Sequence, residues 1–452
     1  MANPVKNIEH FYFLWYALSA ILFVPPAGGG GMEVIMYKAT EFLKYWGQLL
    51  LLPVYWLSFL FPRNKRIWLF GSTFGKRFAD NPKYLYLYMS QHKHKLKIRP
   101  VWISHNKKIV NFLEQNGYEA YYYHSLKGIL FALRGKVYLF DNYSKDINFW
   151  QSGGALKINM WHGIPLKKIQ ADNIFDKFRH PENLFGKFKN FPRNLSDEKP
   201  HHYVLTTSKF LTDIFSSAFN TDNVLAAGYP RNDILVSANI NNLLAANEKK
   251  FLYKIKSFIK ESPDNKMVFY MPTFRESELD FFNVINIGKF QDFLEKNNIL
   301  FCVKLHPKSK LEERFKSIKT NNILVIDAEA DPYIFLNLSD LLVTDYSSIY
   351  FDYLLLGKPI IFFNYDLEKY LDNSRELYFD YNEFTPGEKV ATQEGLQNAL
   401  LHFASNSKAY TDSYKTHRDK ISGKVFDKKH SIACPVLIND IIHILNQQIK
   451  GR

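Results

Sequence analysis

Short apolar runs separated by helical patterns set the strongest constraint on the fold of this chain. In its first half we expect buried strands at 67–72, 99–104, 136–141, 156–161 and 203–208. A helical repeat at 107–116 ends at Gly117, a residue typical of helix C-termini. Strands that alternate with helices build a parallel sheet that is covered by helices. We therefore predict a Rossmann-like N-terminal domain over residues 66–223.

The same alternation restarts after a linker region, predicted at residues 224–265. Five further apolar runs follow it, at 266–271, 300–305, 323–326, 341–344 and 359–363. They predict a second Rossmann-like domain over 266–452. The fold class is therefore α/β, with two Rossmann-like domains that face a cleft. In such folds ligands bind at the carboxyl ends of the strands.

The first 31 residues are set apart by their composition. Residues 11–26 are strongly apolar but shorter than the about 20 residues of a membrane span. Four glycines at 28–31 then precede Met32, which predicts a flexible linker and a native start at Met32. Because a non-native origin is one interpretation of residues 1–31, we leave them out of the fold prediction.

Residues 32–65 hold a second apolar stretch, interrupted by Pro53 and followed by basic residues. Trp46, Tyr55 and Trp56 are of the types that gather at membrane interfaces. We predict a membrane-associating helix that lies in the surface of the bilayer. The alternative is a helix packed against the first domain.

The excess of basic over acidic residues predicts an anionic partner. The chain has 58 basic and 44 acidic residues, a formal net charge of +14. Nucleic acid, anionic lipid and a phosphorylated substrate all fit this charge. Cys302 and Cys434 are the only two cysteines and form no C-x-x-C pair, so no zinc or redox motif is present. Such isolated thiols favour a reducing compartment, the cytoplasm.

Residues 174–193 interleave aromatic and basic side chains. This mixture could stack nucleic-acid bases or dock on anionic lipid. Alternatively, it forms an amphipathic helix whose phenylalanines pack on the core. The residues concerned are Phe175, Phe178, Phe185, Phe188 and Phe191, with Lys177, Arg179, Lys187, Lys189 and Arg193.

Several common catalytic motifs are absent from the sequence. It contains no P-loop, no G-x-S-x-G, no H-E-x-x-H and no D-x-D to hold a metal on a nucleotide diphosphate. We therefore expect no metal site. A phosphate would be held by backbone amides, helix ends and basic side chains.

Two histidines stand at predicted strand ends, one in each domain. His162 precedes Gly163 and Pro165, which predict a turn, and Lys167 and Lys168 follow. His306 follows the strand at 300–305. Since both strand ends face the cleft, the two imidazoles should converge there, and His162 suits general-base catalysis.

Hydroxyl groups and arginines supply candidate phosphate contacts. Ser347 and Ser348 follow the strand at 341–344 at a predicted helix N-terminus, where hydroxyl groups, backbone amides and the helix dipole favour an anion. An ordinary N-cap is the alternative. Arg231 and Arg275 each follow a strand or turn, and a guanidinium can bind phosphate bidentately or form an interface salt bridge.

Taken together, these segments resemble the CDP-glycerol:poly(glycerophosphate) glycerophosphotransferase family, the teichoic-acid polymerases and primases. The resemblance runs from about Phe59 to the C-terminus, and 61–86 is similar to primase-type members. The matching motifs are WHGIPLKKI at 161–169, TSKF at 207–210, GYPRND at 228–233, PTFR at 272–275, KLHP at 304–307, TDYSSIYFDYLLLGKPIIFF at 344–363 and FDYNEFTPG at 379–387.

The resemblance implies a glycosyltransferase-B-like fold with a membrane-associating N-terminal part. The first domain would bind the acceptor and the second the CDP donor. CDP-glycerol or a related CDP-polyol would donate a polyol phosphate to a lipid-linked or glycan acceptor, with release of CMP, in teichoic-acid or capsule-type synthesis. We expect a peripheral enzyme on the cytoplasmic face of a bacterial membrane, with no cofactor and no nucleic-acid partner.

The resemblance places the catalytic residues at His162 and His306. Substrate contacts are expected at Gly163, Lys167, Lys168, Arg231, Thr273, Arg275, Lys304, Ser347, Ser348 and Asp352. Ile164 departs from the smaller or polar residue expected there. The missing long helical extension of processive polymerases favours a primase or a short-acceptor enzyme. A nucleotide-sugar transferase on the same fold and a basic membrane-binding module are the alternatives.

Overall fold

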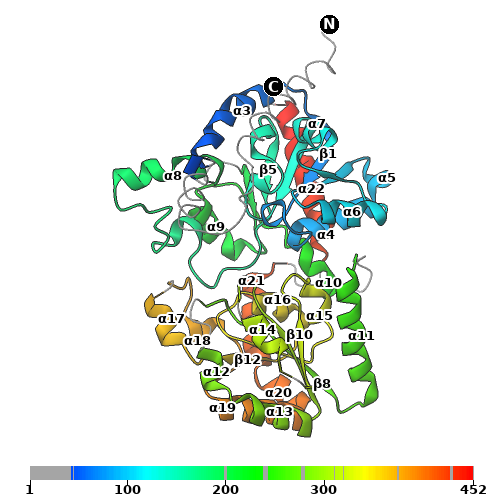
Figure 1. The fold of residues 1–452 in the computed structure, drawn as a ribbon, viewed down its shortest axis with the longest axis vertical. Coiled ribbons are helices and arrows are strands. Elements are labelled where there is room, and N and C mark those ends of the chain that lie inside the picture. Colours follow the sequence, from blue (N-terminus) through cyan, green and yellow to red (C-terminus); the bar gives the residue numbers. More distant parts are fainter. Residues whose placement is uncertain are drawn as a thin grey trace, which may run out of the picture.

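The structure, a computed structural model, describes residues 42–450 except 44, 198–200, 238–242, 276–279, 310, 319, 374–375 and 428–430. The apolar stretch at 11–26, the glycines at 28–31 and Met32 therefore lie outside the described residues, and the predictions about them remain predictions. The described chain folds into two α/β halves stacked one above the other (Figure 1).

The first half is built on a parallel sheet of seven strands in the order β3-β2-β1-β4-β5-β6-β7. Every apolar run predicted here contains a strand. The strands that the sequence did not predict, β3 and β7, are short and lie at the two edges. The strands are β1 (Asn64–Phe70), β2 (Arg99–Ser104), β3 (Ala120–Tyr122), β4 (Gly135–Phe140), β5 (Leu156–Asn159), β6 (Tyr203–Leu205) and β7 (Val224–Leu225).

The second half repeats the design with six parallel strands in the order β10-β9-β8-β11-β12-β13. In both sheets the order reverses beside the first strand, so each has a switch point where ligands bind in such folds. The α/β prediction with two parallel sheets is confirmed. The strands are β8 (Lys266–Tyr270), β9 (Ile299–Lys304), β10 (Ile323–Ile326), β11 (Leu341–Thr344), β12 (Ile360–Phe363) and β13 (Glu388–Val390).

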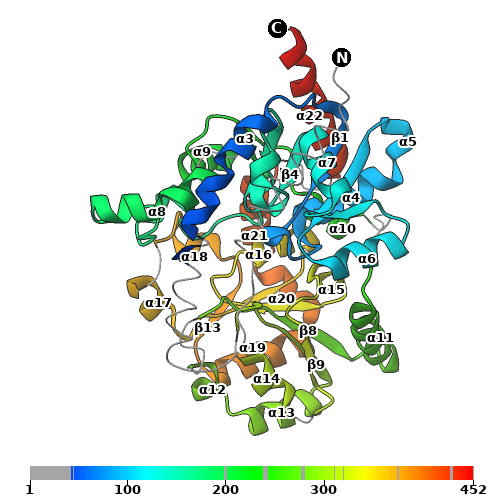
Figure 2. The same cartoon turned by 45° about the horizontal axis from the view of Figure 1, so that its top comes forward.

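Helices cover both faces of each sheet (Figures 1 and 2). In the first half they are α3 (Leu52–Ser58), α4 (Asp80–Gln91), α5 (Lys93–Leu96), α6 (Lys107–Gln115), α7 (Leu126–Arg134), α8 (Leu184–Asp197) and α9 (Thr212–Phe219). The predicted end of α6 is confirmed, because Gly117 adopts a positive φ of 79° just beyond it. Later in the chain come α10 (Asp233–Val236), α11 (Ala246–Glu261), α12 (Asp280–Val284), α13 (Ile287–Lys296), α14 (Leu311–Lys316), α15 (Tyr333–Leu336), α16 (Ile349–Tyr353), α17 (Leu367–Asn373), α18 (Tyr381–Phe384), α19 (Gln393–Ser405), α20 (Ser407–Ser413), α21 (Lys415–Val425) and α22 (Ala433–Lys450).

The region predicted as a linker, 224–265, is largely ordered structure. It supplies the edge strand β7 and helices α10 and α11. The last helix, α22, then returns to the first half and packs against α4 (Figure 1). Asp233 accepts backbone hydrogen bonds from Ala433 at 2.6 Å and Cys434 at 3.0 Å at the start of α22. The chain therefore crosses between the halves twice.

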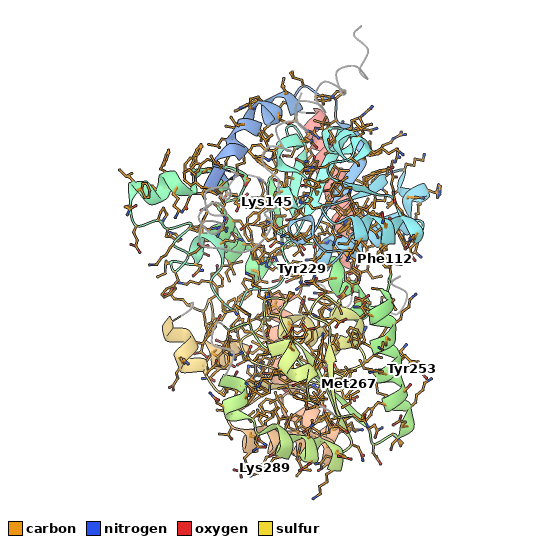
Figure 3. All side chains as sticks on the ribbon, in the orientation of Figure 1. Phe112, Lys145, Tyr229, Tyr253, Met267 and Lys289 are labelled. Carbon is orange, nitrogen blue, oxygen red and sulfur yellow. The ribbon has the colours of Figure 1, made fainter. Side chains whose placement is uncertain are left out.

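Buried polar contacts join the halves. Lys83 on α4 forms an ion pair with Asp331 of the second half at 2.7 Å, and Tyr84 donates to the same carboxylate at 2.8 Å. These three side chains are almost fully buried. Tyr229 lies between the halves (Figure 3). Because breaking a buried pair leaves an uncompensated charge, these contacts fix the relative position of the two sheets.

Helix α3 combines features of both predictions made for residues 32–65. Its inner face packs on the first half: Val54 is fully buried, and Tyr55 stacks on Phe149 at 4.8 Å. Its outer face stays in solvent, with Trp56 67% exposed. Pro53 stands in the first turn of α3, where proline is tolerated, and so does not break it. Among the described residues, no helix is both long enough and apolar enough to cross a bilayer.

Candidate functional site

The cleft between the halves holds a cavity of about 1090 Å³ at the carboxyl ends of both sets of strands. Both predicted histidines line it, together with residues from four further segments, at 175–177, 272–275, 347–348 and 366–370. A second cavity of about 250 Å³ adjoins it and shares His162, Pro272, His306, Ser347 and Ser348. The predicted convergence of the two histidines on one cleft is therefore what the structure contains.

His162 is presented on a strained turn after β5. Trp161 has a φ of 50°, in the left-handed region that bulky residues rarely enter. Its indole packs on the imidazole of His162, with 3.9 Å between ring centroids. His162 itself is exposed in the cavity. Since backbone strain of this kind gathers at functional sites, the turn supports a catalytic role for His162.

The tautomer of His162 follows from one hydrogen bond. Its Nδ1 lies 3.0 Å from the backbone carbonyl oxygen of Asp141. A carbonyl oxygen can only accept, so Nδ1 carries the proton and the neutral ring keeps its lone pair on Nε2. This is the form that a general base requires.

At His306 the Nδ1 atom has the opposite hydrogen-bonding role. Its Nδ1 accepts a hydrogen bond from the backbone amide of Lys308 at 3.1 Å. In the neutral ring the proton must then lie on Nε2, which makes His306 a hydrogen-bond donor at that atom. The cleft therefore combines one acceptor imidazole with one donor imidazole.

Asp141, at the end of β4, was not predicted as a site residue. Its buried carboxylate accepts from Ser72 Oγ at 2.5 Å and from the amide of Thr73 at 2.9 Å. Burial raises the pKa of Asp141, nearby Asp80 raises it further, and His162 and Ser72 oppose the rise. The sequence did carry a signal, because the predicted strand at 136–141 ends on this acid.

Gly163 lets the turn that carries His162 approach the second half closely. Its φ is 152°, and a Cβ atom there would lie 3.1 Å from Ser348 Oγ and 3.4 Å from Arg231 Nη2. A larger residue would therefore have a strained backbone at this φ, and the Ser348 side chain would have to shift by a few tenths of an ångström. Ser347 and Ser348 line both cavities, and the Ser347 amide donates to Asp345 at 2.9 Å. The helix that follows them, α16, spans only Ile349–Tyr353.

Both predicted phosphate-binding arginines are already engaged with carboxylates. Arg275 pairs with Asp345 at 2.8 Å and bidentately with Asp366, although it still borders the cavity. Burial alone would lower its pKa, but the two carboxylates outweigh burial and raise it. Thr273 also donates its hydroxyl to Asp345, at 2.8 Å. Arg275 therefore organises this wall of the cleft and does not present an open guanidinium fork.

Arg231 is likewise occupied by ion pairs with two carboxylates. It pairs with Asp80 at 2.9 Å and with Asp352 at 2.6 Å, and Tyr333 donates to Asp352 at 2.6 Å. Asp352 is fully buried and borders neither cavity. Of the two alternatives for Arg231, the interface salt bridge is the one in the structure.

Of the three predicted lysines, two border a cavity and one lies outside both cavities. Lys167 lines the cavity, with Nζ 5.4 Å and 5.3 Å from the ring centroids of Tyr346 and Tyr370. Lys168 instead forms an ion pair with Glu376 at 2.7 Å outside both cavities. Lys304 borders the smaller cavity and donates to the carbonyl oxygen of Ala328 at 2.9 Å. Burial lowers its pKa to about 8.

A backbone bridge across the cleft was not predicted. Lys167 pairs with Leu377 as an isolated antiparallel bridge, and Tyr378 donates its amide to the carbonyl of Leu166 at 2.9 Å. The loop that follows His162 is thereby fastened to the second half. No sequence pattern marks such a single bridge, because it depends on how the halves meet.

The aromatic and basic segment at 174–193 forms part of an exposed surface. Phe185, Phe188 and Phe191 on α8 are 74%, 62% and 50% exposed, which contradicts the alternative that they pack on the core. Trp46 packs on Phe188 with 4.8 Å between ring centroids. Helix α8 projects from the first half beside the helical part of the chain that contains α3 (Figures 1 and 2). Phe175 and Lys177 of the same segment line the large cavity.

Comparisons with known proteins agree with this geometry. The family model of CDP-Glycerol:Poly(glycerophosphate) glycerophosphotransferase matches residues 54–431. A teichoic acid glycerol-phosphate transferase of Staphylococcus aureus is 30% identical over 77% of this chain and 87% of its own length. A teichoic acid poly(glycerol phosphate) polymerase of Bacillus spizizenii is 28% identical over 82% of this chain and 92% of its own.

The fold is also found among solved structures. A histidine-to-asparagine variant of the wall teichoic acid polymerase TagF, soaked with CDPG, superimposes with a TM-score of 0.65 at 25% identity. The match covers 86% of this chain and 91% of that one.

Proposed function

The chain belongs to the CDP-glycerol:poly(glycerophosphate) glycerophosphotransferase family, and we propose that it transfers glycerol phosphate from CDP-glycerol to a membrane-linked acceptor and releases CMP. This activity serves teichoic-acid or capsule-type polymer synthesis, and a related polyol phosphate would use the same chemistry. The observation that carries the proposal is the pair of histidines in complementary tautomers in one cleft.

The transfer is an in-line displacement at the β-phosphorus of the donor. Nε2 of His162 takes the proton of the acceptor hydroxyl, whose oxygen forms the new bond to phosphorus. The bond between this phosphorus and the oxygen that bridges it to CMP breaks, and CMP departs with that oxygen. The Nε2–H of His306 and the hydroxyls of Ser347 and Ser348 donate to the charged phosphate oxygens.

The buried arginines hold the frame of this site. Arg275 fixes Asp345, which in turn binds Thr273 and the amide of Ser347. Arg231 links Asp80 of the first half to Asp352 of the second. Lys167 and Lys177, which border the cavity, supply positive charge near the donor diphosphate. The substrate contacts expected at Lys168 and Asp352 become structural roles in this scheme.

We propose that the reaction needs no metal ion and no organic cofactor. The sequence has no D-x-D motif to hold a metal on a diphosphate, and histidine, serine and lysine side chains surround the cavity. Activity should therefore survive EDTA. Complete loss in EDTA with recovery in magnesium would require a carboxylate site, with Asp345 and Asp352 the first to examine.

The exposed aromatic surface supports peripheral membrane binding. Exposed apolar side chains gather at 42–60 and 174–191, and basic residues accompany them. Aromatic bulk with positive charge binds anionic membrane interfaces. Since Phe175 and Lys177 also line the cavity, a surface docked there would bring a lipid-linked acceptor to the mouth of the site.

CMP release separates this function from its alternatives. We expect CMP from CDP-glycerol, and CDP-ribitol and UDP-sugars would be assayed in parallel. Turnover of a UDP-sugar alone would establish a sugar transferase on this fold. No turnover with any donor, together with binding to anionic vesicles, would leave a membrane-binding module.

A further inference from the structure

We infer that Asn81 is a positioning residue that holds His162 in its catalytic orientation, an inference that rests on the proposed role of His162 as the base. Asn81 stands in the first turn of α4, far from His162 in the sequence, and is fully buried. It borders neither cavity, so it does not contact substrate.

The amide of Asn81 holds the backbone of the catalytic turn directly. Its Nδ2 donates to the carbonyl oxygens of Met160 at 3.1 Å and Trp161 at 2.9 Å. Its Oδ1 accepts from the backbone amide of Arg231 at 3.2 Å. Both hydrogens and the oxygen of the amide are thereby used, so the orientation of the side chain is fully determined.

These bonds hold the one strained residue of the turn. The left-handed φ of Trp161 is strained and persists only where the surroundings enforce it. Asn81 donates to the carbonyl oxygen of Met160, which precedes the strained residue, and to that of Trp161 itself. Asn159 Oδ1 accepts from the Trp161 amide at 2.9 Å. Because the Trp161 indole packs on the ring of His162, a relaxed Trp161 would also turn the imidazole.

The same turn of α4 is also tied to the second half. Asp80, next to Asn81, pairs with Arg231, which pairs with Asp352. Lys83 and Tyr84 bind Asp331. One helical turn therefore sets His162 relative to the half that carries Ser347 and Ser348. This gives a function to the stretch at 61–86, which the proposed chemistry otherwise does not use.

Aspartate is the sharpest replacement for Asn81. It has nearly the same shape, but its ionised carboxylate has no hydrogen to donate and would face two carbonyl oxygens. In Asn81→Asp we expect the kcat of CMP release from CDP-glycerol to fall about 10–100-fold, the scale of a small misplacement of a catalytic group. The KM for the donor should change by less than about threefold, since donor contacts are untouched.

The pH profile distinguishes positioning from a general loss of structure. A protonated carboxyl at position 81 can again donate one hydrogen bond, so the ratio of variant to parent kcat should rise as the pH is lowered. Because an ionised carboxylate buried there would also destabilise the fold, the folded fraction is measured at each pH and kcat is expressed per folded enzyme. A loss of structure alone then leaves the ratio of variant to parent kcat unchanged with pH. Asn81→Ser, which keeps one donor, should retain more activity than Asn81→Asp at neutral pH.

Asn322→Asp serves as the matched control. It removes a similar bond, from Nδ2 to the carbonyl of Ile299 at 2.9 Å, far from the cleft, and should leave kcat unchanged. A folded Asn81→Asp variant with kcat within about twofold of the parent at every pH would overturn the inference. If Asn81→Asp does not fold, the same criterion applies to Asn81→Ser. A parent enzyme that releases no CMP would instead remove the proposed function and this inference with it.

Discussion

His162 and His306 line one cavity in opposite tautomers. Nδ1 of His162 donates to the carbonyl of Asp141 at 3.0 Å, whereas Nδ1 of His306 accepts from the amide of Lys308 at 3.1 Å. In their neutral forms the first ring offers a lone pair at Nε2 and the second offers an N–H. A proton abstraction and a stabilised phosphate charge need these two properties. The distinct roles lead to distinct predictions.

Replacing His162 with alanine should lower turnover by about 10²–10⁴-fold, the usual effect of losing a general base. Donor affinity should change little, because the base acts on the acceptor hydroxyl. CMP release gives the turnover, and titration calorimetry with CDP-glycerol gives the affinity. Near-normal turnover would show that another group removes the proton.

Substitution by glutamine should distinguish the roles of the two histidines, because the glutamine amide can donate a hydrogen bond but is not a base. His306→Gln should therefore keep more activity than His306→Ala, which we expect to lose about 10²–10³-fold in kcat. His162→Gln should be as inactive as His162→Ala. Equal losses for both substitutions at His306 would mean that its N–H is not what the reaction uses.

We expect Arg275 to contribute mainly to the stability of the folded protein. Arg275→Ala would leave Asp345 and Asp366 buried without a counter-charge, which costs about 3–5 kcal/mol in the free energy of unfolding. Arg99→Ala, which breaks an exposed pair with Glu119, should cost less than about 1 kcal/mol. Urea unfolding measures both. Unchanged stability with about 1.5–3 kcal/mol weaker donor binding would restore the phosphate contact that the sequence predicted.

Lys304 should make stability depend on pH above neutrality. Its pKa is about 8 in the folded protein, lowered by burial from 10.5. Between pH 8 and 10.5 the folded protein binds fewer protons here than the unfolded chain, so the free energy of unfolding rises with pH, by up to about 3 kcal/mol. Lys304→Met should lose this rise, and Lys254→Met on the exposed side of α11 should keep it. A parallel pH dependence in the parent and Lys304→Met would refute the assignment.

The strands were predictable because each buried run repeats the same local pattern. All ten predicted runs contain a strand, and only β3, β7 and β13, of two or three residues, were missed. Strands this short carry no periodic pattern and form because a neighbouring strand leaves an edge to pair with. The return of α22 to the first half is likewise a matter of tertiary packing.

The site was predictable where strand ends and turns point to the cleft. His162, His306, Gly163, Lys167, Ser347 and Ser348 were found in this way and line the cavity. Arg231 and Asp352 pair with each other in the structure, and a motif alone does not reveal that its charges form such a pair. Asn81 was missed because its importance depends on two backbone carbonyls some eighty residues away, which no local pattern records.

Vesicle binding should depend on the surface formed by 42–60 and 174–191. Replacing Lys177, Lys187 and Lys189 with Gln should weaken binding to vesicles that contain phosphatidylglycerol, because each basic residue near the surface contributes about 1 kcal/mol. Arg179 is left intact, since it is half-buried and engaged with Asp176 and the hydroxyl of Tyr143. Salt should weaken the binding of the parent more than that of the variant.

The matched control replaces Lys254, Lys256 and Lys260 with Gln, an equal loss of charge on α11, which lies in the other half of the molecule (Figure 1). It should bind vesicles like the parent. Adding Phe185→Ser and Phe188→Ser to the first triple variant should remove the salt-resistant part of binding, because these side chains are exposed and carry its apolar contribution. Activity on a soluble acceptor analogue should be spared by the two phenylalanine substitutions, since neither side chain lines the cavity. Unchanged vesicle binding in the five-fold variant would move the membrane contact to residues 42–60 alone.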